Sequence, residues 1–281
     1  MKDDVTVSAL SGAIGACIDG IDLAQPLSDE NHTIIFDALM KHLVVFFRGQ
    51  DLTDDQQLAF ASRFGKLNVY PIHESRGLYQ PLDFIEDTPE SPPRTDLWHT
   101  DATFLAEPPD IAVLNMRKMP PVGGDTMWLN LYLAYEKLSD TMKQVVDTLK
   151  WEVHVGDSFK QTTTDLYGED VYNKVADIYR GGQQPMVRVH PVTGRKALFM
   201  CGDYVKGVAG MHPAESRLLL DYLRSLLHDP NIQVRWRYQP YDVAMWDERC
   251  TNHRGLSDHW PAHRIVRRCT VGASRAKGPF D

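Results

Sequence analysis

Apolar residues recur at helical spacing in two segments near the start of the chain, and each segment has a start signal. The first segment follows Ser28, a residue type favoured at helix N-caps, and ends at the apolar run 43–47, which predicts a buried strand. Thr53 and Gln56 form a potential capping box ahead of the second segment, 54–64. We therefore predict two helices separated by a buried strand.

Strand patterns dominate the rest of the chain. Short apolar or alternating runs occur at 110–118, 125–130, 151–156, 186–190 and 234–247. A hairpin signal lies at 190–200, and helical patterns interrupt the strands at 131–149, with a break at Ser139, and at 213–228. Many short strands with Gly and Pro turns favour a mainly β fold with flanking helices, in the form of a jelly-roll barrel.

Two segments fit neither pattern. Residues 74–97 are rich in Pro, Asp and Glu and show no regular period, so we predict a long loop there. The loop leads into a His-containing motif and is placed to act as a lid. Residues 157–184 are predicted to be an insertion. The length of 281 residues and the hydrophobic content of 43% suit a single domain spanning 1–281.

Charge and composition exclude several classes of partner. The formal net charge of −8 gives no reason to expect nucleic acid or an anionic membrane as a partner. The chain has no apolar run of about 18 residues and no apolar signal-peptide core at its start, so we expect a cytoplasmic protein without a membrane partner. Its 4 cysteines are scattered without a CxxC pair, which argues against a zinc-thiolate site or a disulfide scaffold.

His99 and Asp101 are the first candidate metal ligands. Residues two apart in a strand point to the same face, so an imidazole and a carboxylate can converge here. The C-terminal region offers a third ligand from among His253, His259 and His263. Two imidazoles and one carboxylate suit the open coordination of non-haem Fe(II), although zinc hydrolases use similar ligands.

The segment "RIVRRCTV" contributes two candidate anion-binding residues. As a strand, it places Arg264 and Arg268 on one face, about 13 Å apart by strand rise. Inside a barrel each guanidinium needs an anionic partner, because an unpaired buried cation is strongly unfavourable. The partners are either carboxylates of the protein itself or two anionic small molecules.

Four motifs occur in an order typical of one enzyme family: "WHTDATF", "GGDTMW", "WDERCTNHRG" and "HRIVRRCT". With them, nearly the whole chain resembles the taurine dioxygenase and 2,4-dichlorophenoxyacetate dioxygenase family of Fe(II)- and 2-oxoglutarate-dependent oxygenases. The resemblance implies a double-stranded β-helix, a jelly-roll variant. It implies His99, Asp101 and His253 as the iron ligands, and Thr126 and Arg264 as residues that bind 2-oxoglutarate.

The resemblance also implies a reaction. The enzyme would use Fe(II), 2-oxoglutarate and O2 to hydroxylate a small anionic organic substrate, forming succinate and CO2, and the hydroxylated product would often collapse. A zinc hydrolase would leave Arg264 and Thr126 without roles, and a non-catalytic jelly-roll binding protein would not need all three ligands. Members of the family are commonly homo-oligomers, dimers or tetramers.

The substrate pocket is where this chain departs from the taurine enzymes. Arg268 matches the arginine that holds the sulfonate, which indicates a sulfonate, a sulfate ester or a carboxylate head group. Tyr70, His73 and Thr95 stand where those enzymes have histidine, tyrosine and asparagine. The remaining pocket residues implied by the resemblance are aromatic: Phe159 and Tyr204. The ending "TVGASRA" resembles aryloxypropionate members, so aryloxyalkanoates are the alternative substrate class.

Overall fold

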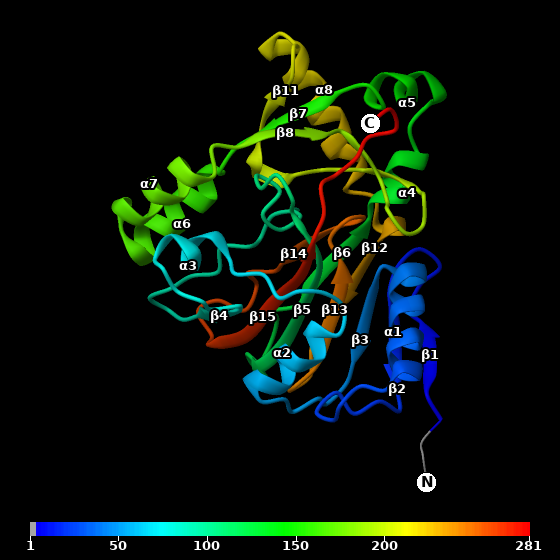
Figure 1. Ribbon diagram of the computed structural model, residues 1–281, viewed down its shortest axis with the longest axis vertical. Helices are drawn as coiled ribbons and strands as arrows, with labels where there is room; N and C mark the ends of the chain where they lie inside the picture. The colour runs from blue at the N-terminus through cyan, green and yellow to red at the C-terminus, as the bar shows by residue number, and fades with distance from the viewer. Residues whose placement is uncertain (1–3) are drawn as a thin grey trace.

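Two β-sheets packed face to face form the centre of the molecule (Figure 1). The computed structural model describes residues 4–281, the side chain of Ser158 excepted. The larger sheet, in spatial order, consists of β1 (Thr6–Ala9), β2 (Ala16–Asp19), β3 (Val44–Phe47), β13 (Val243–Asp247), β5 (Pro109–Lys118), β15 (Arg264–Ala273) and β4 (Leu82–Asp87). The smaller sheet consists of β12 (Gln233–Trp236), β6 (Thr126–Asn130) and β14 (Thr251–Gly255). This arrangement agrees with the predicted jelly roll.

Aromatic side chains fill the space between the two sheets. Trp128 of β6 contacts Phe46 of β3 and Trp246 of β13, with ring centroids 5.3 and 5.6 Å apart. All three side chains are almost fully buried. Edge-to-face packing of large aromatic rings contributes more than burial alone, so these contacts hold the smaller sheet firmly against the larger one.

Helices cover the outer surfaces, and their starts follow the capping signals in the sequence. The Ser28 side chain caps α1 (Asp29–His42), and Thr53 with Gln56 forms the predicted capping box of α2 (Asp54–Ser62). The helix break predicted at Ser139 is confirmed, since Ser139 caps α5. The bounds of the other helices are α3 (Pro71–Ser75), α4 (Leu131–Glu136), α5 (Asp140–Val146), α6 (Asp157–Tyr167), α7 (Glu169–Ile178), α8 (Pro213–Leu226), η1 (Gly202–Tyr204) and η2 (Pro230–Ile232).

Two small sheets lie at one end of the molecule (Figure 1). One consists of β11 (Val205–Val208), β7 (Lys150–Val153) and β8 (Gly182–Pro185). The other is the hairpin of β9 (Val187–Val189) and β10 (Lys196–Leu198), which confirms the hairpin signal at 190–200.

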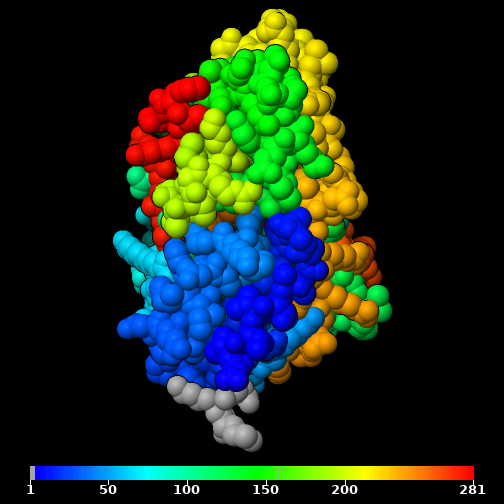
Figure 2. Space-filling view, turned by 90° about the vertical axis from the view of Figure 1, so that its right-hand side faces the viewer, coloured from blue at the N-terminus to red at the C-terminus, as the bar shows by residue number. Residues whose placement is uncertain are grey.

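Figure 2 shows the face where the N-terminal residues, in blue, meet the green segment of α4 and α5.

The predicted loop over 74–97 is wrong for residues 82–87, which form the edge strand β4. β4 pairs antiparallel with β15, and its register sets Asp87 opposite Arg264 and Asp83 opposite Arg268. The strand escaped notice because two of its cavity-facing positions hold carboxylates rather than apolar residues, so the usual alternation is absent. The residues that follow, 88–97, do form an irregular connection to the His99 segment.

The segment 157–184, predicted to be an insertion, consists mostly of α6 and α7 followed by β8. The two helices lie beside α3 at the left of Figure 1, and the Tyr179 hydroxyl donates a hydrogen bond to Glu74 there. Among residues 4–281, no helix has the length and apolar content needed to cross a bilayer. All 4 cysteines carry free thiols, as their spacing predicts.

Candidate functional site

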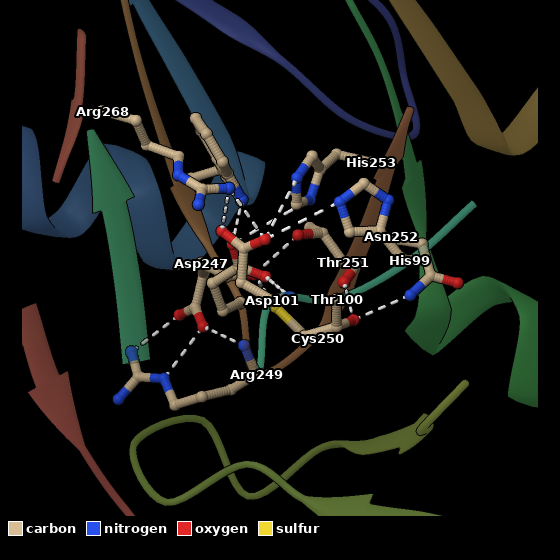
Figure 3. Close-up of polar contacts among 12 residues, drawn as sticks. His99, Thr100, Asp101, Asp247, Arg249, Cys250, Thr251, Asn252, His253 and Arg268 are labelled. Atoms are coloured by element: carbon tan, nitrogen blue, oxygen red, sulfur yellow. Dashed lines mark hydrogen bonds and ion pairs between the residues drawn. The ribbon is translucent and has the colours of Figure 1, made fainter. Parts of the chain in front are cut away.

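His99, Asp101 and His253 converge at one buried point between the sheets (Figure 3). Their potential ligand atoms all lie within 4.8 Å of one another. The Nε2 atoms of His99 and His253 lie 3.6 and 3.8 Å from Asp101 Oδ1. Side chains from distant parts of the sequence therefore offer two imidazoles and a carboxylate to a single point.

Backbone pairing brings the two histidines together. His99 and His253 form an antiparallel bridge in which each backbone N–H donates to the other residue's carbonyl, at 3.0 and 2.8 Å. The His99 Nδ1 lies 2.8 Å from the carbonyl oxygen of Leu97. Because a carbonyl can only accept, Nδ1 carries the proton and the lone pair of Nε2 stays free for a metal.

A glycine allows the chain to pass close to His99. Gly202 has φ +65°, and a Cβ at this position would lie 2.9 Å from His99 Cβ and 3.2 Å from the Trp98 carbonyl oxygen. Any other residue would meet both backbone strain and a steric clash. Gly202 therefore fixes η1 against the metal-ligand segment.

The tertiary structure selects one histidine from the three candidates for the third ligand. His253 contacts the site, whereas His259 Nε2 lies 3.3 Å from Asp87 Oδ2. His263 is partly exposed, with its Nε2 2.5 Å from Glu86. His259 and His263 thus lie outside the ligand cluster, as the resemblance implies.

Charge at the site suits a cation. Burial lowers the pKa of His253 well below its usual value, and His99 adds to this effect, so the His253 imidazole is neutral. Burial acts to raise the pKa of Asp101, but the Arg268 guanidinium and the two imidazoles outweigh it, and the pKa is lowered. A neutral imidazole and an ionised carboxylate are the protonation states that bind a metal.

Glu248 lies beside the cluster and supports it. Its Oε2 accepts the backbone N–H of Asp101 at 3.1 Å, and its Oε1 accepts the Trp246 indole N–H at 2.7 Å. Burial raises the pKa of Glu248 well above its usual value, and the charge of Asp101 adds to the effect. Burial therefore favours the protonated form of Glu248, and its hydrogen bond to the backbone N–H of Asp101 orients that residue.

These residues fit a divalent metal with mixed nitrogen and oxygen ligands. Fe(II) in oxygen-activating enzymes takes two histidines and one carboxylate on one face and keeps its other positions open. The donor atoms are close to one another, the lone pair of His99 Nε2 is free, and a hydrogen-bonded partner orients both His99 and Asp101.

Arg268 connects the metal-ligand cluster to β4. Its Nη1 donates to both oxygens of Asp101, at 2.9 and 2.8 Å, as Figure 3 shows. Its Nε and Nη2 donate to Asp83 Oδ2 at 3.3 and 3.0 Å. Asp83 Oδ1 in turn lies 3.3 Å from His73 Nε2. The protein itself thus supplies carboxylate partners for this arginine.

Arg264 lies four residues before Arg268, at the start of β15, and has a similar partner. Its Nη1 lies 3.4 Å from Asp87, and its Nε donates to the Gly124 carbonyl at 3.1 Å. Gly124 has φ +73°, and a Cβ here would lie 3.0 Å from the Arg264 side chain, which explains the second glycine of "GGDT". Thr126 follows at the start of β6, where its hydroxyl accepts from Tyr238 at 3.3 Å. The two residues predicted to bind 2-oxoglutarate therefore lie in one neighbourhood.

A cavity of about 480 Å³ opens beside His99 and Asp101. Every residue predicted to bind the substrate lines it: Tyr70, His73, Thr95, Phe159, Tyr204 and Arg268. Thr126, Arg264 and His253 are not among the lining residues, although Asp87, the partner of Arg264, is. The structure therefore separates the predicted substrate residues from the predicted cosubstrate residues.

Aromatic rings form one wall of this cavity. The Tyr70 ring lies 6.2 Å from the Phe159 ring, and Arg268 lies over Tyr70 at 5.5 Å. Burial raises the pKa of the Tyr70 hydroxyl, so it keeps its proton and can donate a hydrogen bond. The cavity thus combines an apolar wall with one charged end, an arrangement typical of pockets for small organic ligands.

Sequence reasoning missed Asp83, Asp87 and Glu248. A signal for the first two existed, because Asp83 and Asp87 are four residues apart, as are Arg264 and Arg268. In two paired antiparallel strands, this equal spacing places a carboxylate opposite each guanidinium. Glu248 had no such signal, since its role depends on the contact with Asp101.

A second group of potential ligands, His190, Asp247 and Cys250, is a structural network rather than a metal site. Arg249 donates to both oxygens of Asp247, at 2.8 and 2.7 Å, and His190 Nε2 lies 3.0 Å from Asp247 Oδ2. Burial raises the pKa of the Cys250 thiol well above its usual value, so the thiol stays protonated. The carboxylate is occupied and no thiolate is available.

Comparison with known proteins gives consistent matches over nearly the whole chain. Residues 6–270 match the family model described as "Taurine catabolism dioxygenase TauD, TfdA family". An alkylsulfatase of Acinetobacter baylyi is 36% identical, over 96% of this chain and 85% of the relative. An alpha-ketoglutarate-dependent sulfate ester dioxygenase of Pseudomonas putida is 34% identical, over 95% and 89%. The crystal structure of a taurine dioxygenase from Burkholderia xenovorans superimposes with a TM-score of 0.82 at 31% identity, covering 99% of this chain and 94% of that one.

Proposed function

Because the chain belongs to the TauD/TfdA family and is an alpha-ketoglutarate-dependent dioxygenase with the predicted jelly-roll fold, we propose that it hydroxylates a sulfate ester. Alpha-ketoglutarate is 2-oxoglutarate, so the resemblance inferred from the motifs is confirmed. The family assignment sets aside a zinc hydrolase and a non-catalytic binding protein. The observation that carries the proposal is the convergence of His99, Asp101 and His253 beside a cavity with Arg268 at its charged end.

His99, Asp101 and His253 would hold Fe(II), and Arg264 with Thr126 would hold 2-oxoglutarate. When bound, the iron and 2-oxoglutarate together supply the O2 activation that hydroxylates a C–H bond and yields succinate and CO2. The guanidinium fork of Arg264 suits a carboxylate. Glu248 keeps Asp101 in place through the Asp101 backbone N–H. No side chain of the site is required to act as a general acid or base.

Arg268 would bind the anionic head group, and the aromatic wall of Tyr70, Phe159 and Tyr204 would contact the organic part of the substrate. The sulfate ester is favoured because the alkylsulfatase and the sulfate ester dioxygenase are 36% and 34% identical to the chain, whereas a 2,4-dichlorophenoxyacetate dioxygenase that matches a similar share of it is 31% identical. Hydroxylation of the carbon that carries the sulfate would give an unstable product that releases sulfate.

The test is an assay of O2 uptake and succinate formation with Fe(II) and 2-oxoglutarate. The substrate panel contains alkyl sulfates, alkanesulfonates and aryloxyalkanoates of matched chain length. We expect succinate and inorganic sulfate to appear together with an alkyl sulfate. If only an aryloxyalkanoate were turned over, that compound class, and not the sulfate ester, would be the substrate. If no compound increased succinate formation, the proposed substrate class would be contradicted.

Replacement of Arg268 should weaken substrate binding. We expect Arg268→Gln to raise the KM for the alkyl sulfate about 30-fold, because a charge-assisted bidentate contact is lost. The KM for 2-oxoglutarate should change little. Arg267 is the matched control, since it lies on the other face of β15, over the Phe84 ring at 4.1 Å. Arg267→Gln should leave both KM values near those of the wild type. If Arg268→Gln instead raised the KM for 2-oxoglutarate more than that for the alkyl sulfate, Arg268 would bind the cosubstrate and Arg264 the substrate.

A further inference from the structure

The edge of Arg268 that would bind a substrate head group is already occupied. An arginine side chain carries five N–H groups. Four hydrogen bonds engage them here, two from Nη1 to Asp101 and two from Nε and Nη2 to Asp83. The Nε and Nη2 atoms together form the edge of the guanidinium that binds planar or tetrahedral oxyanions through two hydrogen bonds. The Asp83 carboxylate occupies the place on Arg268 that such an oxyanion would take.

Asp83 is built into the cavity wall rather than placed there by chance. The β4–β15 register sets it directly opposite Arg268, and only 14% of its side chain is exposed. His73 Nε2 lies 3.3 Å from its other oxygen. The carboxylate therefore stands between an arginine and a histidine that both line the substrate cavity.

We propose that Asp83 is a specificity-determining residue that competes with the substrate's anionic head group for Arg268. The inference rests on the proposed function, which assigns Arg268 to that head group. A substrate must displace the Asp83 carboxylate or share the guanidinium with it, and like charges at this distance repel. Asp83 Oδ2 accepts both N–H groups, so a head group binds well only when an anionic oxygen takes its place, which favours sulfate, sulfonate and carboxylate over neutral groups.

The competition predicts that loss of the Asp83 charge tightens binding. We expect Asp83→Asn to lower the Kd of butyl sulfate about tenfold, because asparagine keeps the shape but removes the competing charge. Binding is measured by calorimetric titration of the enzyme with iron and 2-oxoglutarate in the absence of O2, so no turnover consumes the ligand. An unchanged or higher Kd, or no binding by Asp83→Asn, would overturn the proposal.

Two controls separate this effect from a general change of charge. Glu90→Gln removes one negative charge from the exposed loop after β4, where Glu90 contacts Thr88, and should leave the Kd unchanged. In an Arg268→Gln background, Asp83→Asn should no longer tighten binding, since the contested guanidinium is gone. A tenfold gain that persists in this background would show that Asp83 acts on the substrate without Arg268.

A second variant guards against poor folding of the first. Asp83→Ala removes the charge and the acceptor together and should also bind butyl sulfate more tightly than the wild type. Thermal melting reports whether each variant is folded. The turnover assay and the titration together distinguish two failures: absence of succinate with every substrate contradicts the proposed function, whereas equal affinities of wild type and Asp83→Asn contradict the competition.

Discussion

His253→Ala is expected to abolish turnover and to lower metal affinity by at least about 100-fold, because it removes one of three ligands. The His253 ring packs between Trp246 and His99, with centroids 4.9 and 4.2 Å away. Metal content after equilibrium dialysis against Fe(II), together with succinate formation, measures both effects. His253→Gln keeps more of the side-chain volume and should give the same loss.

His263→Ala is the matched control for this prediction. His263 belongs to the same C-terminal segment and is a candidate by residue type alone, but it contacts Glu86 and Lys118 at the surface. We expect His263→Ala to bind one metal ion per chain and to retain turnover. If His253→Ala bound iron as the wild type does, the assignment of His253 as a ligand would be wrong.

Arg264→Ala is expected to raise the KM for 2-oxoglutarate about 50-fold, because the loss of a buried guanidinium removes a charge-assisted clamp. The KM for the sulfate ester should change far less. Arg264→Lys keeps the charge but loses the fork, so an intermediate KM is expected. Initial rates of succinate formation with one substrate varied at a time provide the measurement.

The same substitution also tests the Asp87 contact. Removing Arg264 leaves the buried carboxylate of Asp87 without its guanidinium, which should destabilise the fold by about 3 kcal/mol. The double variant Arg264→Ala with Asp87→Asn should recover most of the thermal stability but not the affinity for 2-oxoglutarate. Recovery of both would mean that Arg264 acts on the cosubstrate only through the stability of the site.

The sequence by itself determined the local structure, the candidate metal ligands and the family. Helix starts at Ser28, Thr53 and Ser139 depend on hydrogen bonds within a few residues, so they are visible in the sequence. His99 and Asp101 share one short segment, and their side chains reach the same point. The ordered motifs were sufficient to identify the oxygenase family, which the family match confirms.

Only the tertiary structure decided which distant groups meet. The approach of His253 to His99 depends on a backbone bridge that joins residues more than 150 positions apart. The carboxylates opposite Arg264 and Arg268 depend on the register between β4 and β15, which no local pattern encodes. A buried guanidinium requires an anion, but its charge alone does not say whether a ligand or the protein supplies it. The structure shows that Asp83 and Asp87 already do.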